Sequence, residues 1–170
     1  LGVAVGEALE SKSPRPWKWR GRSVKLVDGT TVSMPDTAAN QARYPQSGEA
    51  KPGVGFPLAM VLGVISLSTG AVLGWALGPC RGKQTGELAM FRALLSSFDP
   101  GDVVVADRLH CTYFTVAMLR ERGVDLVTRQ HSHRHTDGRC GKRLGRHDRL
   151  VQWRRPRCPD WMDVETYARM

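Results

Sequence analysis

Two aspartates, Asp28 and Asp107, each follow a short apolar run and are spaced so that they could act together on one metal ion. The preceding residues are VKLV and VVVA, which are typical of strands. If these two strands lie side by side and parallel, both carboxylates reach the same end of a sheet, where open α/β sheets place their sites. Neighbouring carboxylates repel each other, and Mg²⁺ relieves the repulsion by binding to both. The alternative is that each aspartate only caps a turn.

The elements that would position these aspartates follow from the apolar periodicity. We expect strands near 24–28, 58–67, 71–78, 103–106 and 124–128, with helices near 84–96 and 112–122. This order, β-β-β-α-β-α-β, predicts an α/β fold with a mixed sheet: the first three strands are antiparallel, and helical crossovers make the later ones parallel. A short helix, DTAANQA, capped by Asp36, should follow the first strand, and a further strand pair is expected at 148–154 and 162–167.

The stretch 56–79 carries no charged residue and is long enough to span a bilayer. It also contains internal glycines, a Ser-Leu-Ser-Thr-Gly sequence in its middle and a proline near each end. These features favour two buried strands joined by a tight turn over a membrane helix.

The net charge of +9 is concentrated in two segments. Residues 12–25 contain six Lys or Arg and no acid, and residues 129–157 contain ten against two aspartates. Such segments favour a polyanionic partner, above all double-stranded DNA, although two solvated basic loops would look the same. The candidate DNA-binding residues in them are Lys18, Arg20, Arg22, Arg154, Arg155 and Arg157.

Three other patterns in the sequence say less about function. GPCRGKQT (78–85) has the wrong spacing for a phosphate-binding loop. HSHRH (131–135), with Cys140 nearby, is typical of a mobile basic loop more than of a metal site. The four cysteines lie far apart, so no disulfide framework is expected and a reducing cytoplasm is the default.

The stretch VDGTTVSMPDTAANQARYP, followed by VVVADR and a helix, resembles bacterial transposases of the insertion-sequence-four family, which have an RNase H-like catalytic core and a DDE motif. The resemblance covers about residues 20–170. It implies that Asp28 and Asp107 are the first two catalytic acids and bind Mg²⁺, with Mn²⁺ as a substitute, and that Arg108 lies near DNA phosphate. It further implies metal-dependent cleavage and strand transfer at insertion-sequence ends, a homodimer in the active complex, and a bacterial cytoplasmic location without membrane contact.

The family's third acid is a glutamate on a later helix, in a Tyr-x₂-Arg-x₃-Glu-x₆-Lys pattern that no tyrosine of this chain begins. Glu165 sits in no helical pattern and is a poor substitute. We therefore expect no third catalytic acid within the chain, and no activity from these residues alone. The expected parts are a basic linker (1–20), the first part of the core (21–130), and a basic segment that opens a β-rich insertion (131–170). A non-catalytic DNA-binding remnant and an RNase H-like nuclease remain as alternatives.

Overall fold

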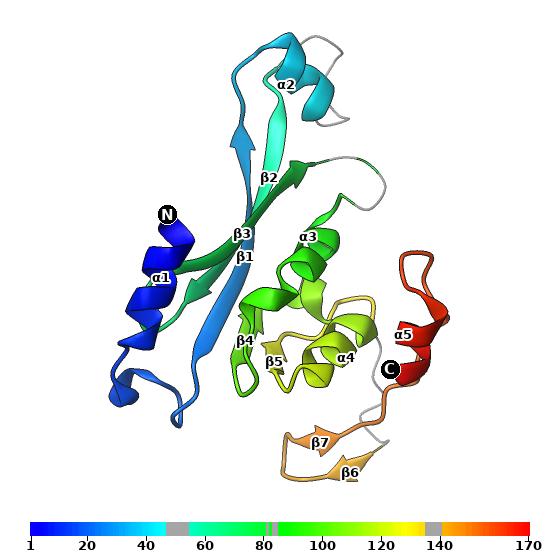
Figure 1. The fold of residues 1–170 in the computed structure, drawn as a ribbon. Helices are drawn as coiled ribbons and strands as arrows, with labels where there is room; N and C mark the ends of the chain where they lie inside the picture. Colours follow the sequence, from blue (N-terminus) through cyan, green and yellow to red (C-terminus); the bar gives the residue numbers. More distant parts are fainter. Residues whose placement is uncertain (47–54, 81, 83–84, 135–140) are drawn as a thin grey trace.

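The computed structural model describes residues 1–46, 55–80, 82, 85–134 and 141–170, and its centre is a five-stranded mixed sheet (Figure 1). The strand order is β3-β2-β1-β4-β5. The strands are β1 (Val24–Ser33), β2 (Leu58–Ser66), β3 (Val72–Pro79), β4 (Val103–Ala106) and β5 (Asp125–Thr128). Strands β1, β2 and β3 pair antiparallel, whereas β4 is parallel to both β1 and β5. The predicted order of elements and direction of the strands are confirmed.

Two helices make the crossovers and pack on one face of the sheet. Helix α3 (Glu87–Ala93) continues into a 3₁₀ turn, η2 (Leu95–Ser97), and helix α4 (Tyr113–Glu121) follows a second 3₁₀ turn, η3 (Arg108–His110). Side chains of the helices and strands form one core: Val27, Leu62, Val64, Leu73, Met90, Phe91, Leu94, Phe98, Val104, Leu119 and Val124. Helix α3 is shorter than the predicted 84–96, and its N-cap is Gly86, which provides no side-chain cap. Gln84, one of its predicted first residues, lies outside the described residues.

The uncharged stretch forms the β2–β3 hairpin, as predicted. The turn closes when the Gly70 amide donates to the Ser66 carbonyl at 2.9 Å, and Gly70 adopts a φ of 70°, which favours glycine. No helix in the described parts of the chain is long and apolar enough to cross a membrane.

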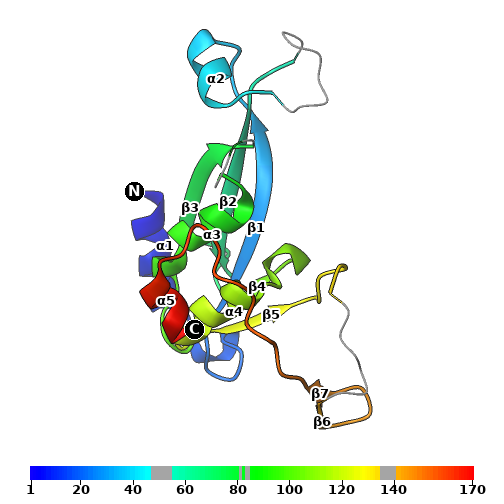
Figure 2. The same ribbon diagram turned by 90° about the vertical axis from the view of Figure 1, so that its right-hand side faces the viewer.

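Helix α1 (Gly2–Ser11) was not predicted and packs on β3 at the edge of the sheet (Figures 1 and 2). Its close approach depends on Gly6, because a Cβ there would lie 2.2 Å from the Val72 carbonyl oxygen. At the end of the helix, Glu10 accepts hydrogen bonds from the hydroxyls of Ser66 and Ser68. The region expected to be a linker therefore contains a helix that contacts the core sheet.

Helix α2 (Ala38–Arg43) forms as expected but with another cap. The Thr37 hydroxyl accepts from the Asn40 amide at 3.2 Å, which makes Thr37 the N-cap. Asp36 lies one residue too early and instead accepts from the Gln41 side chain at 2.7 Å. The prediction of Asp36 as the cap was wrong.

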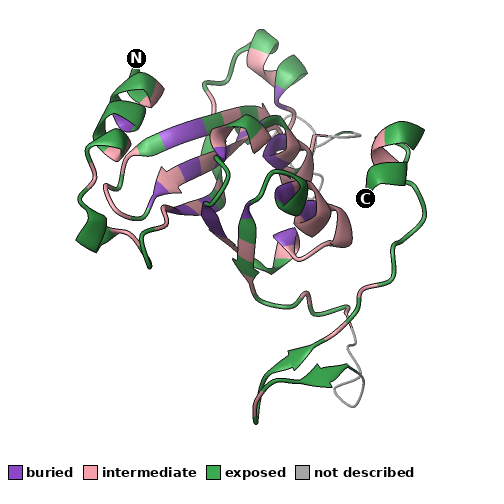
Figure 3. Ribbon diagram, turned by 60° about the horizontal axis from the view of Figure 1, so that its bottom comes forward, coloured by how far each residue is buried: buried purple, intermediate pink, exposed green. Residues whose placement is uncertain are grey.

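The C-terminal region differs from the predicted strand pair. A two-stranded ribbon joins β6 (Lys142–Arg143) to β7 (Arg149–Leu150), and residues 151–159 have no regular structure. Helix α5 (Val164–Arg169) then begins where the Asp163 carboxylate accepts from the Thr166 amide at 2.7 Å. This cap explains why the segment is helical. It also corrects the statement about Glu165, which lies in the first turn of this helix. The ribbon and α5 are largely exposed (Figure 3).

Candidate active site

The parallel pairing of β1 with β4 brings the two predicted catalytic aspartates together in the backbone. The register runs from Val24 opposite Val103 to Val27 opposite Ala106. The next residue in each chain segment is an aspartate, Asp28 in β1 and Asp107 directly after β4. Both side chains are exposed.

Hydrogen bonds fix the position of Asp107. Its carboxylate accepts from the Leu109 amide at 2.8 Å and so caps η3. Its carbonyl oxygen accepts from the Thr128 hydroxyl at 2.6 Å, which ties it to the end of β5. Asp28 is held more locally, because its carboxylate accepts from the following amide, that of Gly29, at 3.0 Å. Each carboxylate is thus held by a backbone amide close to it in the sequence, and Asp28 is also part of the β1–β2 ladder.

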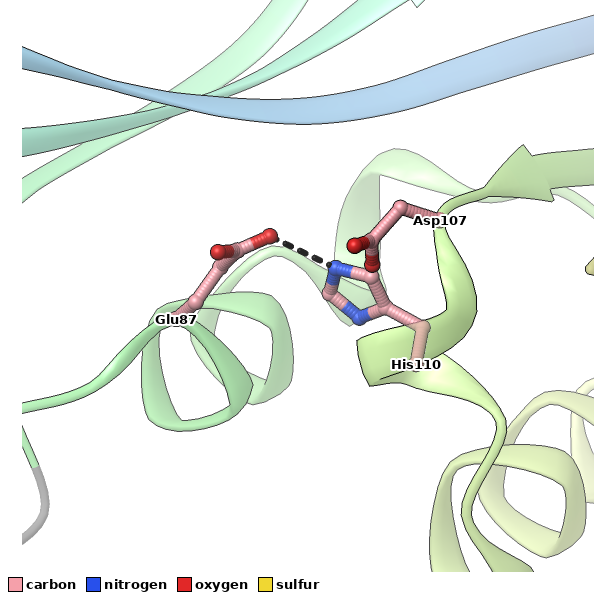
Figure 4. A group of neighbouring side chains, drawn as sticks. All are labelled: Glu87, Asp107 and His110. Atoms are coloured by element: carbon pink, nitrogen blue, oxygen red, sulfur yellow. Dashed lines mark hydrogen bonds and ion pairs between the residues drawn. The ribbon is translucent and has the colours of Figure 1, made fainter. Parts of the chain in front are cut away.

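Asp107 lies in a group of potential metal ligands that was not predicted from the sequence (Figure 4). One ligand atom from each of Glu87, Asp107 and His110 lies within 4.8 Å of the others. The His110 side chain is fully buried, its Nε2 lies 3.0 Å from Glu87 Oε1, and its ring packs against Phe91 at a centroid distance of 4.9 Å. The signals in the sequence were weak: a glutamate at the start of a helix and a histidine three residues after Asp107.

Asp28 is adjacent to this group but is not a member of it. Val27 packs into the core beneath α3, and a Cβ on Gly29 would lie 3.0 Å from the Glu87 carboxyl carbon. Because side chains alternate along a strand, Val27 and Gly29 point toward α3, and Asp28 projects from the opposite face of β1. Glu87 and Asp28 therefore flank the same short piece of β1 from its two sides.

The donor set suits a hard divalent cation. Carboxylate oxygens are the ligands that Mg²⁺ and Mn²⁺ prefer, whereas imidazole favours zinc and other transition metals. Two oxygens bound to opposite sides of one Mg²⁺ are about 4.2 Å apart, given metal–oxygen distances of about 2.1 Å. The ligand atoms of Glu87, Asp107 and His110 all lie within 4.8 Å of one another, which is compatible with binding of one ion between the carboxylates.

The predicted DNA-binding residues are distributed over the molecule. Arg108 is exposed in η3, directly beside Asp107. Lys18, Arg20 and Arg22 precede β1 and so lie toward the amino ends of the parallel strands, away from the Asp107 end.

Two of the predicted arginines have partners within the fold. Arg22 donates to the carbonyls of Gly101 and Asp102 at 2.6 and 2.9 Å and pairs with Asp125 at 2.7 Å. Arg155 donates to the Tyr167 carbonyl at 2.9 Å, and its guanidinium lies over the Tyr167 ring. Arg154 and Arg157 are exposed. Contacts of all these residues with DNA stay predictions.

A basic hollow of about 420 Å³ opens near the end of β5. Its lining includes Thr128, the residue that holds the Asp107 carbonyl, together with the cationic or titratable side chains of Arg134, His147 and Arg149. The Arg134 guanidinium lies 3.6 Å from the centroid of the Trp153 ring, so this hollow combines positive charge with an aromatic surface.

The histidine-rich segment lies beside this hollow. The rings of His131 and His133 stack at a centroid distance of 5.3 Å, and neither belongs to the group of potential metal ligands found among the described residues. His135 and Cys140 lie outside the described residues.

The fold is a mixed sheet with acidic side chains where β1 and β4 run side by side. The chain matches the transposase DDE domain family over residues 19–169 and belongs to that family. No curated protein matches it. A solved structure, the Mos1 transposase paired-end complex with left transposon end, is 14% identical, with a TM-score of 0.37; the match covers 73% of this chain and 40% of that chain. The match thus spans less than half of that transposase's length.

Proposed function

We propose that this chain is part of a bacterial transposase of the insertion-sequence-four kind, which cleaves DNA at the ends of its element and joins them to target DNA. The observation that carries the proposal is the parallel register of β1 and β4, which makes Asp28 and Asp107 neighbours in the sheet. Membership of the transposase DDE domain family supports the class of reaction.

Asp28 and Asp107 are the residues that would hold Mg²⁺ or Mn²⁺. When bound, such ions activate the attacking oxygen and stabilise the leaving oxygen of a phosphodiester. The protein supplies position and charge. The cap to the Leu109 amide and the bond from Thr128 fix Asp107, and Arg108 presents an exposed guanidinium next to it for a phosphate oxygen.

Double-stranded DNA would pass the Asp107 end of the sheet. Arg108 and the basic hollow with Arg134 and Arg149 offer phosphate contacts there, and Trp153 offers a stacking surface. The exposed Arg154 and Arg157 extend this positive surface along the chain. We propose in addition that two copies act together on paired element ends, in the cytoplasm of a bacterium.

The test is cleavage of a DNA duplex carrying the element's terminal repeat by the full-length protein. Asp28→Asn and Asp107→Asn should each abolish cleavage while DNA binding stays equal or becomes slightly stronger, since a negative charge near phosphate is gone. Asp36→Asn is the matched control, because Asp36 is exposed and lies on the α2 loop. Cleavage retained in the Asp107→Asn protein would end the proposal.

The products of the same assay separate the alternatives. A DNA-binding remnant would bind the duplex and cut nothing even with unchanged residues. An RNase H-like nuclease would hydrolyse strands without joining a 3′ end to a target molecule. Joined products that depend on both aspartates would support the transposase.

A further inference from the structure

We propose that Glu87 binds a divalent metal ion together with Asp107, and that His110 orients the Glu87 carboxylate. The idea rests on the proposed function for the role of Asp107. It adds an acidic ligand to the two aspartates that the family pattern implies within the chain. Glu87 precedes Asp107 in the sequence and comes from a different element, the first turn of α3.

The position of Glu87 favours a role in metal binding. Its carboxylate is one of three groups whose ligand atoms all lie within 4.8 Å of one another, and Asp107 is another (Figure 4). The same carboxylate lies over Gly29, whose absent side chain makes room for it: a Cβ there would lie 3.0 to 3.3 Å from all three of its atoms. Glu87 thus reaches both the Asp28–Gly29 backbone and the Asp107 carboxylate.

The burial of Glu87 and His110 and the contact between them also favour this role. The Glu87 side chain keeps 19% of its surface exposed, while His110 is fully buried. His110 Nδ1 is buried with no hydrogen-bond partner among the described residues, and Nε2 faces Glu87 Oε1 at 3.0 Å. In the tautomer with hydrogen on Nε2, the histidine donates to Oε1 and leaves Oε2 for an ion. Such outer hydrogen bonds commonly orient metal ligands.

The charges around Glu87 also favour a bound cation. Glu87 and Asp107 place two negative groups close together, with one imidazole beside them, and like charges at this distance cost energy unless a cation joins them. Oxygen ligands select a hard ion such as Mg²⁺ or Mn²⁺. We assign His110 the role of a positioning residue, which acts on the ion through Glu87.

The competing explanation is a purely structural ion pair that holds η3 against α3. Both explanations predict that Glu87→Ala is destabilising, so that variant does not separate them. Glu87→Gln does, because the amide oxygen still accepts from His110 Nε2 and the fold is kept, whereas the negative charge that an ion needs is lost.

The experiment is a titration of the 170-residue chain with Mn²⁺, read from the electron paramagnetic resonance signal of the free ion, so that no DNA and no activity is involved. Glu87→Gln should weaken Mn²⁺ binding by about tenfold or more, with an unchanged circular dichroism spectrum. The matched control is Glu121→Gln, an exposed glutamate on α4. Unchanged Mn²⁺ affinity in Glu87→Gln would overturn the inference.

A second variant tests the geometry without touching any ligand. Gly29→Ala should move the Glu87 carboxylate by a few tenths of an ångström and weaken Mn²⁺ binding, while the strand forms normally, since the atoms it meets end a flexible side chain. Gly63→Ala is the control on the adjacent strand, because a Cβ there has only ordinary contacts, at 3.9 and 4.0 Å. Equal Mn²⁺ affinity in the two variants would contradict the placement of Glu87 at the ion.

The role of His110 is tested by a pair of substitutions. His110→Phe fills the buried space beside Phe91 but removes the donor to Glu87, and should weaken Mn²⁺ binding by about 10- to 100-fold. His110→Gln keeps a donor and should restore part of the affinity. If both variants bind Mn²⁺ as the unchanged chain does, His110 is only a packing residue.

Asp28→Asn and Asp107→Asn, in the same titration, separate this inference from the proposed function. Loss of Mn²⁺ binding in both of these variants, but not in Glu87→Gln, would refute the inference alone. Loss in Glu87→Gln and Asp107→Asn, but not in Asp28→Asn, would keep the inference and refute the proposed role of Asp28. No loss in any of the three would refute both.

Discussion

Asp107 combines a structural and a chemical role in one side chain. The oxygen that caps η3 belongs to the same carboxylate that faces Glu87 and His110, so the start of the 3₁₀ turn and the orientation of the acid are set together. Asp107→Asn retains a cap, because asparagine also accepts a backbone hydrogen bond. Asp107→Asn therefore removes the negative charge and leaves the turn intact.

Metal exchange gives a prediction at the same site. In the cleavage assay, Mn²⁺ should replace Mg²⁺, since both favour six oxygen ligands. Ca²⁺ also prefers oxygen ligands and should bind, but with metal–oxygen distances of about 2.3–2.6 Å its looser shell positions an attacking oxygen poorly. We therefore expect Ca²⁺ to compete with Mn²⁺ for binding and to inhibit cleavage. Cleavage at full rate in Ca²⁺ would contradict this account of the site.

Lys25 carries the next prediction, on stability. Its side chain is 5% exposed, and its ammonium lies 2.6 Å from Asp102 and donates to the Ser97 carbonyl at 2.8 Å. Lys25→Ala leaves the buried Asp102 carboxylate without its cation, so the free energy of unfolding should fall by about 3–5 kcal/mol. Urea denaturation measures the change, with the exposed Lys12→Ala as control. A loss below about 1 kcal/mol would show that water or another cation replaces Lys25.

At the scale of elements, helix α1 depends on one close contact. In Gly6→Ala the new Cβ would lie 2.2 Å from a backbone oxygen of β3, which cannot move aside, so the helix should be displaced and its amides should exchange hydrogen faster. Gly2→Ala is the control in the same helix, because no atom lies within 4 Å of a Cβ there. Equal exchange rates in the two variants would show that α1 does not dock as described.

The same helix should respond to acid. Burial raises the pKa of Glu10, but hydrogen bonds from Ser66, Ser23 and Ser68 and the charge of Lys18 lower it more, and the net pKa is below the usual 4.5. A carboxyl group with a lowered pKa in the folded state stabilises that state above its unfolded pKa, and this contribution is lost as the pH falls through the folded value. Thermal unfolding of Glu10→Gln should therefore differ from that of the unchanged chain near neutral pH and converge with it below about pH 4.5.

Strands were predicted better than caps and contacts. The strand 103–106 was correct to the residue because three consecutive valines, an alanine and a following turn leave little choice. The cap of α2 was misassigned by one residue because Asp36 and Thr37 are both good caps and only the backbone decides between them. Glu87 and His110 were missed because their proximity depends on how α3 and η3 pack, which no local pattern records.

Helix α5 was not predicted from the sequence. A strand was expected at 162–167, but the cap at Asp163 and the hydrogen bond from Arg155 to the Tyr167 carbonyl favour a helix. The Arg155 contact depends on the extended segment before α5, which no local pattern records.

At the scale of the whole molecule, the distribution of charge predicts salt-dependent binding. If the basic surface contacts phosphates, the logarithm of the DNA affinity should fall linearly with the logarithm of salt concentration, largely without sequence preference for this chain. Reversing the charges of the exposed Arg154 and Arg157 should make this slope less steep, by the amount that about two phosphate contacts contribute. We leave Arg155 unchanged in this variant because its bond to Tyr167 supports α5.

Reversal of Lys12 and Arg15, before the sheet, is the matched comparison in the same salt series. Both pairs remove the same charge, so a difference in slope reports position and not net charge. Equal slopes would mean that binding follows overall charge and that neither segment has a defined contact.

The pairing of β1 with β4 also has a kinetic consequence. Asp28 and Asp107 become neighbours only when β4 adds to the edge of a hairpin that was completed much earlier along the chain. Closing so long a loop is slow compared with forming the β1–β2–β3 meander from adjacent segments. We therefore expect the acidic site to form late in folding, in the step that adds β4, so that a nascent chain that ends before β4 holds Asp28 without its partner.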